Sequence, residues 1–322
     1  MTQITFVQIV THAGPFHPDD VLAAAALRVL TPNASVLRTR DEALLAEAKA
    51  NPDSILIDVG GEYDVDRSCY DHHQKGGAGS RENGVPFSSL GLIWRHYGNA
   101  VVATKLIRDI GVNLDQCRAI AELIDDELIQ GVDALDNGVA EPRFRPTLSG
   151  TDLPLKAVTL GEAIFALNPQ SVLGEEDFDG RFEQAVRLAG AMLDGVVRQC
   201  AARYLGHQLL IEGRRVEDKL VVVDKHVDDW SDVVSAEFPE TLFLLEPDTS
   251  VPGAWMIWQV PTTPRGFEGR KQLPESWAGL RGADLEAVTD IEGSGFCHTY
   301  RFCGGAANLE AALMMAKAAI DA

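Results

Sequence analysis

Histidines and aspartates gather in the short stretch THAGPFHPDD, between Thr11 and Asp20. His12, His17 and Asp19 supply imidazole and carboxylate groups directly after an apolar run and directly before an alanine-rich segment. A lone aspartate after an apolar strand is more often a helix cap or a turn former than a metal ligand. The stretch therefore indicates a binding site only if distant segments offer matching groups.

Three more clusters of the same residue types follow in the first half of the chain. They are Asp58 in SILIDVGG, Asp71, His72 and His73 in YDHHQKG, and Asp133 with Asp136 in GVDALDNG. These nitrogen and oxygen donors, with no cysteine among them, suit Mn²⁺, Mg²⁺ or another octahedral cation better than structural zinc. Their number exceeds the need of one ion and fits a pair of ions ~3.5–4 Å apart that share a carboxylate.

Such a pair of cations would bind a phosphoryl oxygen, lower the pKa of a water between them and neutralise charge on a leaving group. Without cations the acidic clusters would repel a phosphate, so the metal hypothesis and the phosphoester hypothesis depend on each other. The net charge of −20 argues against a protein that coats long nucleic acids, because that function usually needs a basic stripe. It does not exclude a nuclease whose cations lie in the cleft.

Alternating strand and helix patterns position these clusters. We expect strands over Ile4–Val10, Ser35–Thr39 and Ser54–Gly61, and helices over Asp19–Leu30, Asp41–Ala50, Leu114–Gln130 and Phe178–His207. Strands separated by helices imply a parallel sheet, and open sheets of this kind place ligands at the carboxyl ends of their strands.

The second half of the chain has a different pattern. The β-like runs KLVVVD, TLFLLE and AWMIWQV lead to a Gly-rich loop and a helix over Asn308–Ile320. The sequence therefore predicts an α/β fold with a metal-binding catalytic domain over residues 1–207 and a smaller α/β domain over residues 208–322.

The cysteines and the apolar runs bear on the compartment. Five scattered cysteines without a CxxC pair predict reduced thiols and no zinc–thiolate site. No apolar run approaches the ~18 residues of a membrane span, and no basic segment precedes the first apolar stretch. We therefore expect a cytoplasmic protein.

The order of the clusters resembles the DHH phosphoesterase superfamily: H…HxD, an Asp at a strand end, DHH, and a fourth Asp. More narrowly, THAGPFHPDD, VLRTRD, DVGGEYD, YDHHQKG and VDALDNG resemble the MYG1 family, as do RKQLPESWAGLRGADLEAV and GFCHTYRFCGGAANLEAALMMA near the C-terminus. The resemblance spans nearly the whole chain. It implies a DHH-type parallel-sheet domain joined to a smaller C-terminal domain, with a metal-dependent phosphodiesterase site in the cleft between them. The family's eukaryotic members are regarded as 3′–5′ RNA exonucleases.

The resemblance also implies roles by position. The expected metal ligands are His12, His17, Asp19, Asp58, His72 and Asp136, with Asp133 as the alternative to Asp136. Asp58 would be the shared carboxylate, and His17 stands where the wider superfamily generally has a carboxylate. His73 would touch the phosphate or donate a proton, and Asp71 would orient a neighbouring ligand. Mn²⁺ is the expected metal, with Mg²⁺ as the alternative.

Positive charge and substrate contacts must come from the second domain. The expected residues are His298, Arg301, Gly304, Gly305, Arg270 and Arg281. Backbone N–H groups of a Gly-rich turn before a helix can bind phosphate, and arginine can bind it bidentately. Composition alone also allows a solvated loop. Trp255, Trp258 and Trp277 could stack on bases. AWMIWQV, however, has the pattern of a strand, which favours packing of Trp255 and Trp258 in a core or an interface.

The resulting hypothesis is a two-metal hydrolase that cleaves a phosphodiester, at the 3′ end of RNA or of a short oligonucleotide. One alternative is a small-molecule phosphoesterase or pyrophosphatase that uses the same metals. Another is a non-enzymatic regulator that binds metal or a nucleotide. The sequence leaves the physiological substrate, the choice of RNA or DNA, the native metal and the oligomeric state open.

Overall fold

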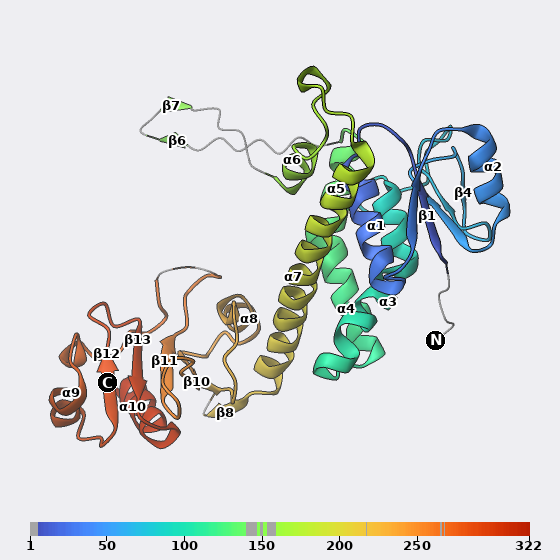
Figure 1. Ribbon diagram of the computed structural model, residues 1–322. Coiled ribbons are helices and arrows are strands. Elements are labelled where there is room, and N and C mark those ends of the chain that lie inside the picture. The colour runs from blue at the N-terminus through green and yellow to red at the C-terminus, as the bar shows by residue number, and fades with distance from the viewer. Residues whose placement is uncertain are drawn as a thin grey trace. The chain divides into compact units, whose positions relative to one another are not determined.

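The computed structural model describes residues 6–139, 147–148, 151–152, 159–216, 218–264, 266 and 268–322. It divides into two compact units, Met1–Cys200 and Ala201–Ala322, and the division falls within the long helix α7 (Phe178–Glu212) (Figure 1). Each unit has its own sheet, so the predicted α/β class is confirmed.

The first unit contains a five-stranded sheet in the order β2-β1-β3-β5-β4. Its strands are β1 (Gln8–Thr11), β2 (Ser35–Arg38), β3 (Ser54–Ile57), β4 (Tyr63–Asp64) and β5 (Cys69–Tyr70). The first four in sheet order run parallel, and β4 adds an antiparallel edge. The prediction of a parallel sheet with helical crossovers is therefore confirmed.

The predicted strands are longer than the observed ones. Ile4 and Thr5 lie outside the described residues. The third strand ends at Ile57 instead of Gly61, because the backbone turns at Asp58, which has a φ of 54°, and the turn continues through Gly60 and Gly61 at positive φ. Asp58 is not a glycine, and this left-handed conformation costs free energy that the surrounding structure must offset.

Helices cover this sheet and extend from it. They are α1 (Pro18–Leu30), α2 (Glu42–Ala50), α3 (Ser89–Ile110), α4 (Leu114–Ile124), the π-helical η1 (Asp125–Ile129), α5 (Gln130–Asp136), α6 (Leu160–Phe165), the 3₁₀ turn η2 (Ser171–Leu173) and α7. Helix α3 was not predicted, although it packs along α1. Its composition, with histidine, tyrosine and two internal glycines, weakens the helical pattern. The short strands β6 (Thr147–Leu148) and β7 (Thr151–Asp152) pair with each other.

The second unit is built on a six-stranded sheet in the order β12-β13-β11-β10-β9-β8. Its elements are β8 (Arg214–Val216), β9 (Leu220–Val222), α8 (Trp230–Glu237), β10 (Phe243–Pro247), β11 (Trp255–Gln259), η3 (Glu275–Trp277), α9 (Gly282–Thr289), β12 (Ser294–Cys297), β13 (Cys303–Ala306) and α10 (Leu309–Asp321). Strands β9 and β10 are parallel, and the other pairs are antiparallel.

Two apolar cores lie on the two faces of this second sheet. Leu245 and Ile257 pack with Met315 of α10 on one face. Leu244 packs with Val234 of α8 and with Leu210 at the end of α7 on the other. Successive residues of a strand alternate between faces, which accounts for the division between Leu244 and Leu245. All five cysteines lie among the described residues and are buried, and no disulfide joins any two of them.

Candidate metal centre

Three neighbouring parallel strands end at the same edge of the first sheet, and a polar residue follows each of them. His12 follows β1, Asp58 follows β3, and Asp71 and His72 follow β5. His12 Nε2 lies 3.3 Å from Asp58 Oδ2, and His72 Nε2 lies 3.4 Å from Asp58 Oδ1. Asp58 thus contacts the two imidazoles through different carboxylate oxygens, which is the arrangement expected of a shared ligand.

Helices α1 and α5 add groups from the other side. Asp19 of α1 places Oδ2 at 3.9 Å from His72 Nε2, and Asp136 at the end of α5 places Oδ2 at 3.2 Å from the same nitrogen. His17 immediately precedes α1, and its ring lies 5.5 Å from that of His12. The four distant segments singled out in the sequence therefore meet in space.

Overlapping sets of these residues could hold a metal ion. Ligand atoms within 4.8 Å of one another are offered by His12, His17 and Asp58, by Asp58, His72 and His73, and by His17, Asp19 and Asp136. Asp58 and His17 each belong to two of the sets. Several of the same groups are buried and have no hydrogen-bond partner within the described part of the chain: His12 Nε2, His72 Nε2 and both carboxylate oxygens of Asp19. Buried polar atoms are nearly always satisfied in proteins, so this donor set fits divalent cations.

The buried carboxylates perturb one another. Burial, and next the Asp58 charge, raise the pKa of Asp19 well above its ordinary value. Burial also raises the pKa of Asp20 to about 7, against the opposing effect of His12. For Asp58 burial acts in the same direction, but contacts with His12, His72 and His73 outweigh it and lower the pKa. Asp58 is therefore ionised beside two buried acids, Asp19 and Asp20, that resist ionisation.

The imidazoles carry the matching positive charge. Burial opposes protonation of His72, but Asp136 and Asp58 raise its pKa to about 10. Contact with Asp58 raises the pKa of His73 to about 9 against the effect of burial, with help from Asp71. A metal ion requires deprotonated imidazole, so a divalent cation bound by His72 would replace the positive charge of the proton on that ring.

Asp71 organises the DHH segment. Its Oδ1 accepts hydrogen bonds from the backbone N–H groups of His72 (2.7 Å) and His73 (3.1 Å) and contacts His73 Nδ1 at 2.9 Å. Its Oδ2 accepts from the N–H of Gly61 at 2.6 Å. The carboxylate therefore fixes the backbone of both histidines and the ring of His73. The ring of His72 is oriented by Asp58 and Asp136 instead.

The structure separates the two aspartates of GVDALDNG. Asp133 is fully buried, and its oxygens accept from Arg81 Nη1 (2.7 Å), Ser88 Oγ (2.5 Å) and the N–H of Gly91 (3.0 Å). Its carboxylate is thus satisfied away from the histidines, and it belongs to none of the metal-holding sets found among the described residues. Asp136, one helical turn later, faces His72 instead.

Asp20 was not among the predicted site residues. Its Oδ1 accepts from the backbone N–H of His17 at 2.9 Å, which fixes the start of α1, and its Oδ2 lies 3.4 Å from His12 Nε2 without a hydrogen bond. The second aspartate of HPDD was the only signal for it. Arg40 of VLRTRD is a second residue to which the sequence assigned no function. It lines a cavity of about 320 Å³ together with His12, His17, Asp58, Val59, Gly60, Gly61, Asp71 and His73.

The substrate-binding residues expected in the second unit have mixed surroundings. Gly304 and Gly305 do not form a turn before a helix but lie within strand β13, where a Cβ would come within 2.9 Å of the Phe296 carbonyl oxygen and 2.5 Å of its ring, respectively. Arg270 donates to the carbonyls of Phe238, Thr241 and Ser235 and so stabilises the fold. These three residues therefore have structural reasons for their identity.

The other three are closer to the surface. Arg301 Nη2 donates to Gln272 Oε1 at 2.6 Å, and its backbone has a φ of 62°. The His298 ring lies 4.4 Å from that of Phe302. Arg281 is exposed, with its guanidinium 5.4 Å from the centre of the Phe296 ring.

Comparison with known proteins covers nearly the whole chain. The family model MYG1_exonuc, described as "Uncharacterised protein family (UPF0160)", matches residues 8–320. The human protein named MYG1 exonuclease is 32% identical over 97% of this chain and 85% of its own. The MYG1 protein of Dictyostelium discoideum is 28% identical over 96% of this chain and 94% of its own.

A solved pGpG-specific phosphodiesterase, PggH from Vibrio cholerae, aligns over 98% of this chain and 97% of its own at 13% identity, but with a TM-score of 0.26 the likeness supports no conclusion. Among the described residues, no helix is both long and apolar enough to cross a membrane. The full-length matches confirm the resemblance and the hydrolase class that the sequence predicted. The chain belongs to the MYG1 family.

Proposed function

We propose that the protein is a metal-dependent phosphodiesterase that acts as a 3′–5′ exonuclease on RNA or short oligonucleotides. The observation that carries the proposal is Asp58, whose two oxygens lie 3.3 and 3.4 Å from the nitrogens of His12 and His72. A carboxylate in this position can be shared by two cations. The exonuclease name of the human relative supports the nuclease activity.

The residues that would hold the cations are six of the seven expected ligands: His12, His17, Asp19, Asp58, His72 and Asp136. When bound there, divalent cations supply charge neutralisation for a phosphodiester and activation of a water. The chain itself needs them for binding, because the ionised and nearly buried Asp58 would otherwise repel a phosphate.

His73 is the proposed proton donor. Its side chain is 62% exposed and lines the cavity beside Asp58. Asp71 and Asp58 contact its Nδ1 at 2.9 and 3.3 Å, which leaves Nε2 available to a substrate. In the metal-free protein, contacts with Asp58 and Asp71 raise the pKa of the ring to about 9, so the ring is protonated at neutral pH. It can therefore donate a hydrogen bond to a phosphate oxygen, or a proton to the leaving oxygen.

The second candidate is a small-molecule phosphoesterase or pyrophosphatase on the same ligands. The size of the cavity favours it, because about 320 Å³ is at the lower end of the ~300–1,000 Å³ typical of ligand pockets. A site of this size holds one nucleotide unit, which also agrees with removal of single nucleotides from a chain end.

A substrate panel distinguishes these functions. Purified protein is stripped with chelator, reloaded with Mn²⁺ or Mg²⁺, and given a dinucleotide, a 20-mer RNA labelled at either end, and pyrophosphate. We expect metal-dependent hydrolysis of the dinucleotide and stepwise shortening of the 20-mer from its 3′ end. Asp115→Asn, at a side chain that is 93% exposed and remote from the cluster in sequence, serves as the control. Hydrolysis of pyrophosphate alone would replace the proposal with the second candidate, and no metal-dependent hydrolysis at all would refute both.

A further inference from the structure

One row of residues crosses four strands of the second unit's sheet. Strand pairing places Glu246 of β10 opposite Met256 of β11, Met256 opposite Gly305 of β13, and Gly305 opposite Phe296 of β12. Residues directly opposite one another point to the same face. The neighbouring row, with Leu245 and Ile257, enters the core beneath α10, so this row faces the other way.

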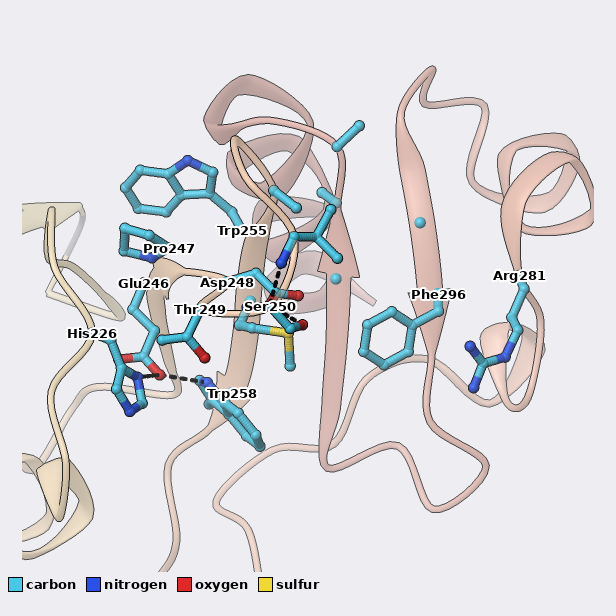
Figure 2. A pocket seen from close by; sticks show the side chains of 17 residues that line it. His226, Glu246, Pro247, Asp248, Thr249, Ser250, Trp255, Trp258, Arg281 and Phe296 are labelled. Carbon is cyan, nitrogen blue, oxygen red and sulfur yellow. Dashed lines mark hydrogen bonds and ion pairs between the residues drawn. The ribbon is translucent and has the colours of Figure 1, made fainter.

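A cavity of about 630 Å³, here called the sheet-face cavity, lies over this row. Its lining includes Trp255, Trp258 and Phe296, and Figure 2 shows Trp258 and Phe296 on opposite sides of it. All three aromatic side chains are only partly buried. The sequence favoured core or interface packing for the two tryptophans, and each does pack against one of the two apolar cores while also lining this cavity.

Two glycines, Gly295 and Gly305, deepen the cavity because they place no side chain on the sheet at this point. A Cβ on Gly305 would meet the Phe296 ring at 2.5 Å, and a Cβ on Gly295 would meet the Gly305 carbonyl oxygen at 2.9 Å. The absence of side chains here lets the Phe296 ring lie against the sheet and leaves space beside Met256. Close approach of a ligand or of another group to the backbone is one of the reasons for glycine within a strand.

The buried carboxylate beside the cavity is fully occupied. Glu246 Oε1 accepts from Trp258 Nε1 at 2.9 Å and contacts His226 Nδ1 at 3.0 Å, and Oε2 accepts from the N–H of Val227 at 3.0 Å. These bonds hold the indole of Trp258 in one orientation (Figure 2). They also compensate the negative charge, so the carboxylate does not need a ligand of its own.

Asp248 on the rim is satisfied in the same way. Its Oδ1 accepts from the N–H groups of Ser250 (2.7 Å) and Val251 (3.2 Å), which stiffens the loop over the cavity. Arg281 differs, because no ion pair within the described part of the chain holds its guanidinium. It is a free cation beside an aromatic ring, in a protein with a net charge of −20.

We propose that the sheet-face cavity binds the base of a nucleotide, stacked against Phe296 and Trp258, with the phosphate of that nucleotide on Arg281. Aromatic rings that accept every base by its flat face, combined with an arginine, are the usual means of binding single-stranded nucleic acid without sequence selection. The inference rests on the proposed function, since it names the part of the second unit that would hold a nucleotide of the substrate.

The test measures nucleotide binding by the intact chain in the presence of chelator, so that the metal centre does not contribute. Isothermal titration uses adenosine 5′-monophosphate, adenosine and inorganic phosphate as probes. We expect Phe296→Leu to weaken the binding of the monophosphate and of adenosine about tenfold, within the range for loss of one base–aromatic stack. Arg281→Gln should weaken the binding of the monophosphate several-fold and leave that of adenosine unchanged.

Arg214→Gln is the matched control, because Arg214 is an exposed arginine on β8, at the opposite edge of the same sheet. Thermal unfolding of each variant verifies the fold, and the surface variant Arg281→Gln tests the proposal even if Phe296→Leu fails to fold. Equal affinities in the wild type and both variants would overturn the inference. A change in sedimentation with Phe296→Leu, without a change in affinity, would show instead that two copies of the chain meet at this face.

These outcomes are independent of the proposed function. Metal-dependent hydrolysis of bis(p-nitrophenyl) phosphate, which carries no nucleobase, reports on the metal centre alone. If that hydrolysis persists while Phe296→Leu leaves the nucleotide affinity unchanged, the cavity proposal fails and the phosphodiesterase proposal stands. If Phe296→Leu weakens nucleotide binding but no phosphoester is hydrolysed, the cavity proposal stands and the phosphodiesterase proposal fails.

Discussion

Asp19 of the first unit and Glu246 of the second are equally buried, with 0% and 1% of their surfaces exposed, yet their surroundings are opposite. Glu246 has a backbone N–H, an indole N–H and an imidazole for its two oxygens. Neither oxygen of Asp19 has a hydrogen-bond partner among the residues that the structure describes. A buried carboxylate is thus no sign of a metal site by itself. The difference is in the hydrogen-bond partners: Asp19 lacks them and is available to a cation, whereas Glu246 has them and stabilises the fold.

The same contrast separates Asp133 from Asp136, three residues apart. Asp133 is bound by Arg81, Ser88 and Gly91, whereas Asp136 contacts His72. Residue type and local pattern do not distinguish the two, and only the resemblance to the family favoured Asp136. Substitution of a carboxylate that faces the histidines should lower metal content and activity, whereas substitution of one with satisfied hydrogen bonds should lower stability.

The largest expected effect is on Asp58. Asp58→Asn should lower phosphodiester hydrolysis at least a thousandfold, because one substitution removes the charge that His12 and His72 both contact. Bound Mn²⁺, measured by plasma mass spectrometry, should fall in parallel, while circular dichroism stays unchanged. Activity within tenfold of wild type would show that Asp58 is not the shared ligand.

A smaller loss is expected at His73. His73→Gln should lower the turnover number about a hundredfold, the lower end of the effect of a general acid, and leave the metal content unchanged. His73 differs from His72 in this respect, because 62% of its side chain is exposed and only 7% of that of His72. A loss of metal as large as the loss of turnover would assign His73 to the ligands instead.

Asp133→Asn should show the opposite signature. Breaking a buried ion pair costs about 3–5 kcal/mol, and Arg81 would lose a partner held at 2.7 Å. We therefore expect a clear drop in the free energy of unfolding, measured by urea titration, with metal content per folded molecule unchanged. Asp136→Asn should lose metal with a smaller change in stability. Loss of metal in the Asp133 variant at unchanged stability would reverse the two assignments.

The sequence predicted the positions of the site better than the contacts within it. Apolar runs ending near His12 and at Asp58 were sufficient to place these two residues at one sheet edge, because parallel strands align their carboxyl ends. The strand before Asp71, β5, has only two residues and was not predicted. The choice of Asp136 depends on which face of α5 meets His72, and the partners of Asp133 come from residues 42 to 52 positions away. No local pattern encodes such a contact.

The second unit was harder to predict for a related reason. GFCHTYRFCGG contains the glycines expected of a turn, but Gly304 and Gly305 are required where a strand passes under Phe296. Only the pairing of β12 with β13 reveals that requirement. Helix α3 was not predicted because its polar and aromatic residues obscure the helical periodicity of its apolar residues. In the structure α3 is stabilised by packing against α1.

The smallest expected effect is a pH dependence confined to the metal-free protein. The pKa of Asp20 is raised from 3.8 to about 7, and that of His72 from 6.5 to about 10. In both cases the folded state binds more protons than the unfolded state, so stability falls as pH rises, from about 4 to 7 for Asp20 and from 6.5 to 10 for His72. The lowered pKa of Asp58 acts only below pH 4.

We therefore expect the Tm in chelator to fall by several degrees between pH 6 and pH 9, since 1 kcal/mol corresponds to about 2–4 °C in mid-sized domains. Saturating Mn²⁺ should reverse this trend, because the cation replaces the lost protons and binds more tightly to deprotonated imidazole. Scanning calorimetry at both pH values, with and without Mn²⁺, measures the two slopes. Glu246 has no comparable deficit, so a Glu246→Gln variant should keep the same difference between chelator and Mn²⁺. Equal slopes with and without the cation would mean that the buried acids of the first unit are satisfied without a metal, as Glu246 is.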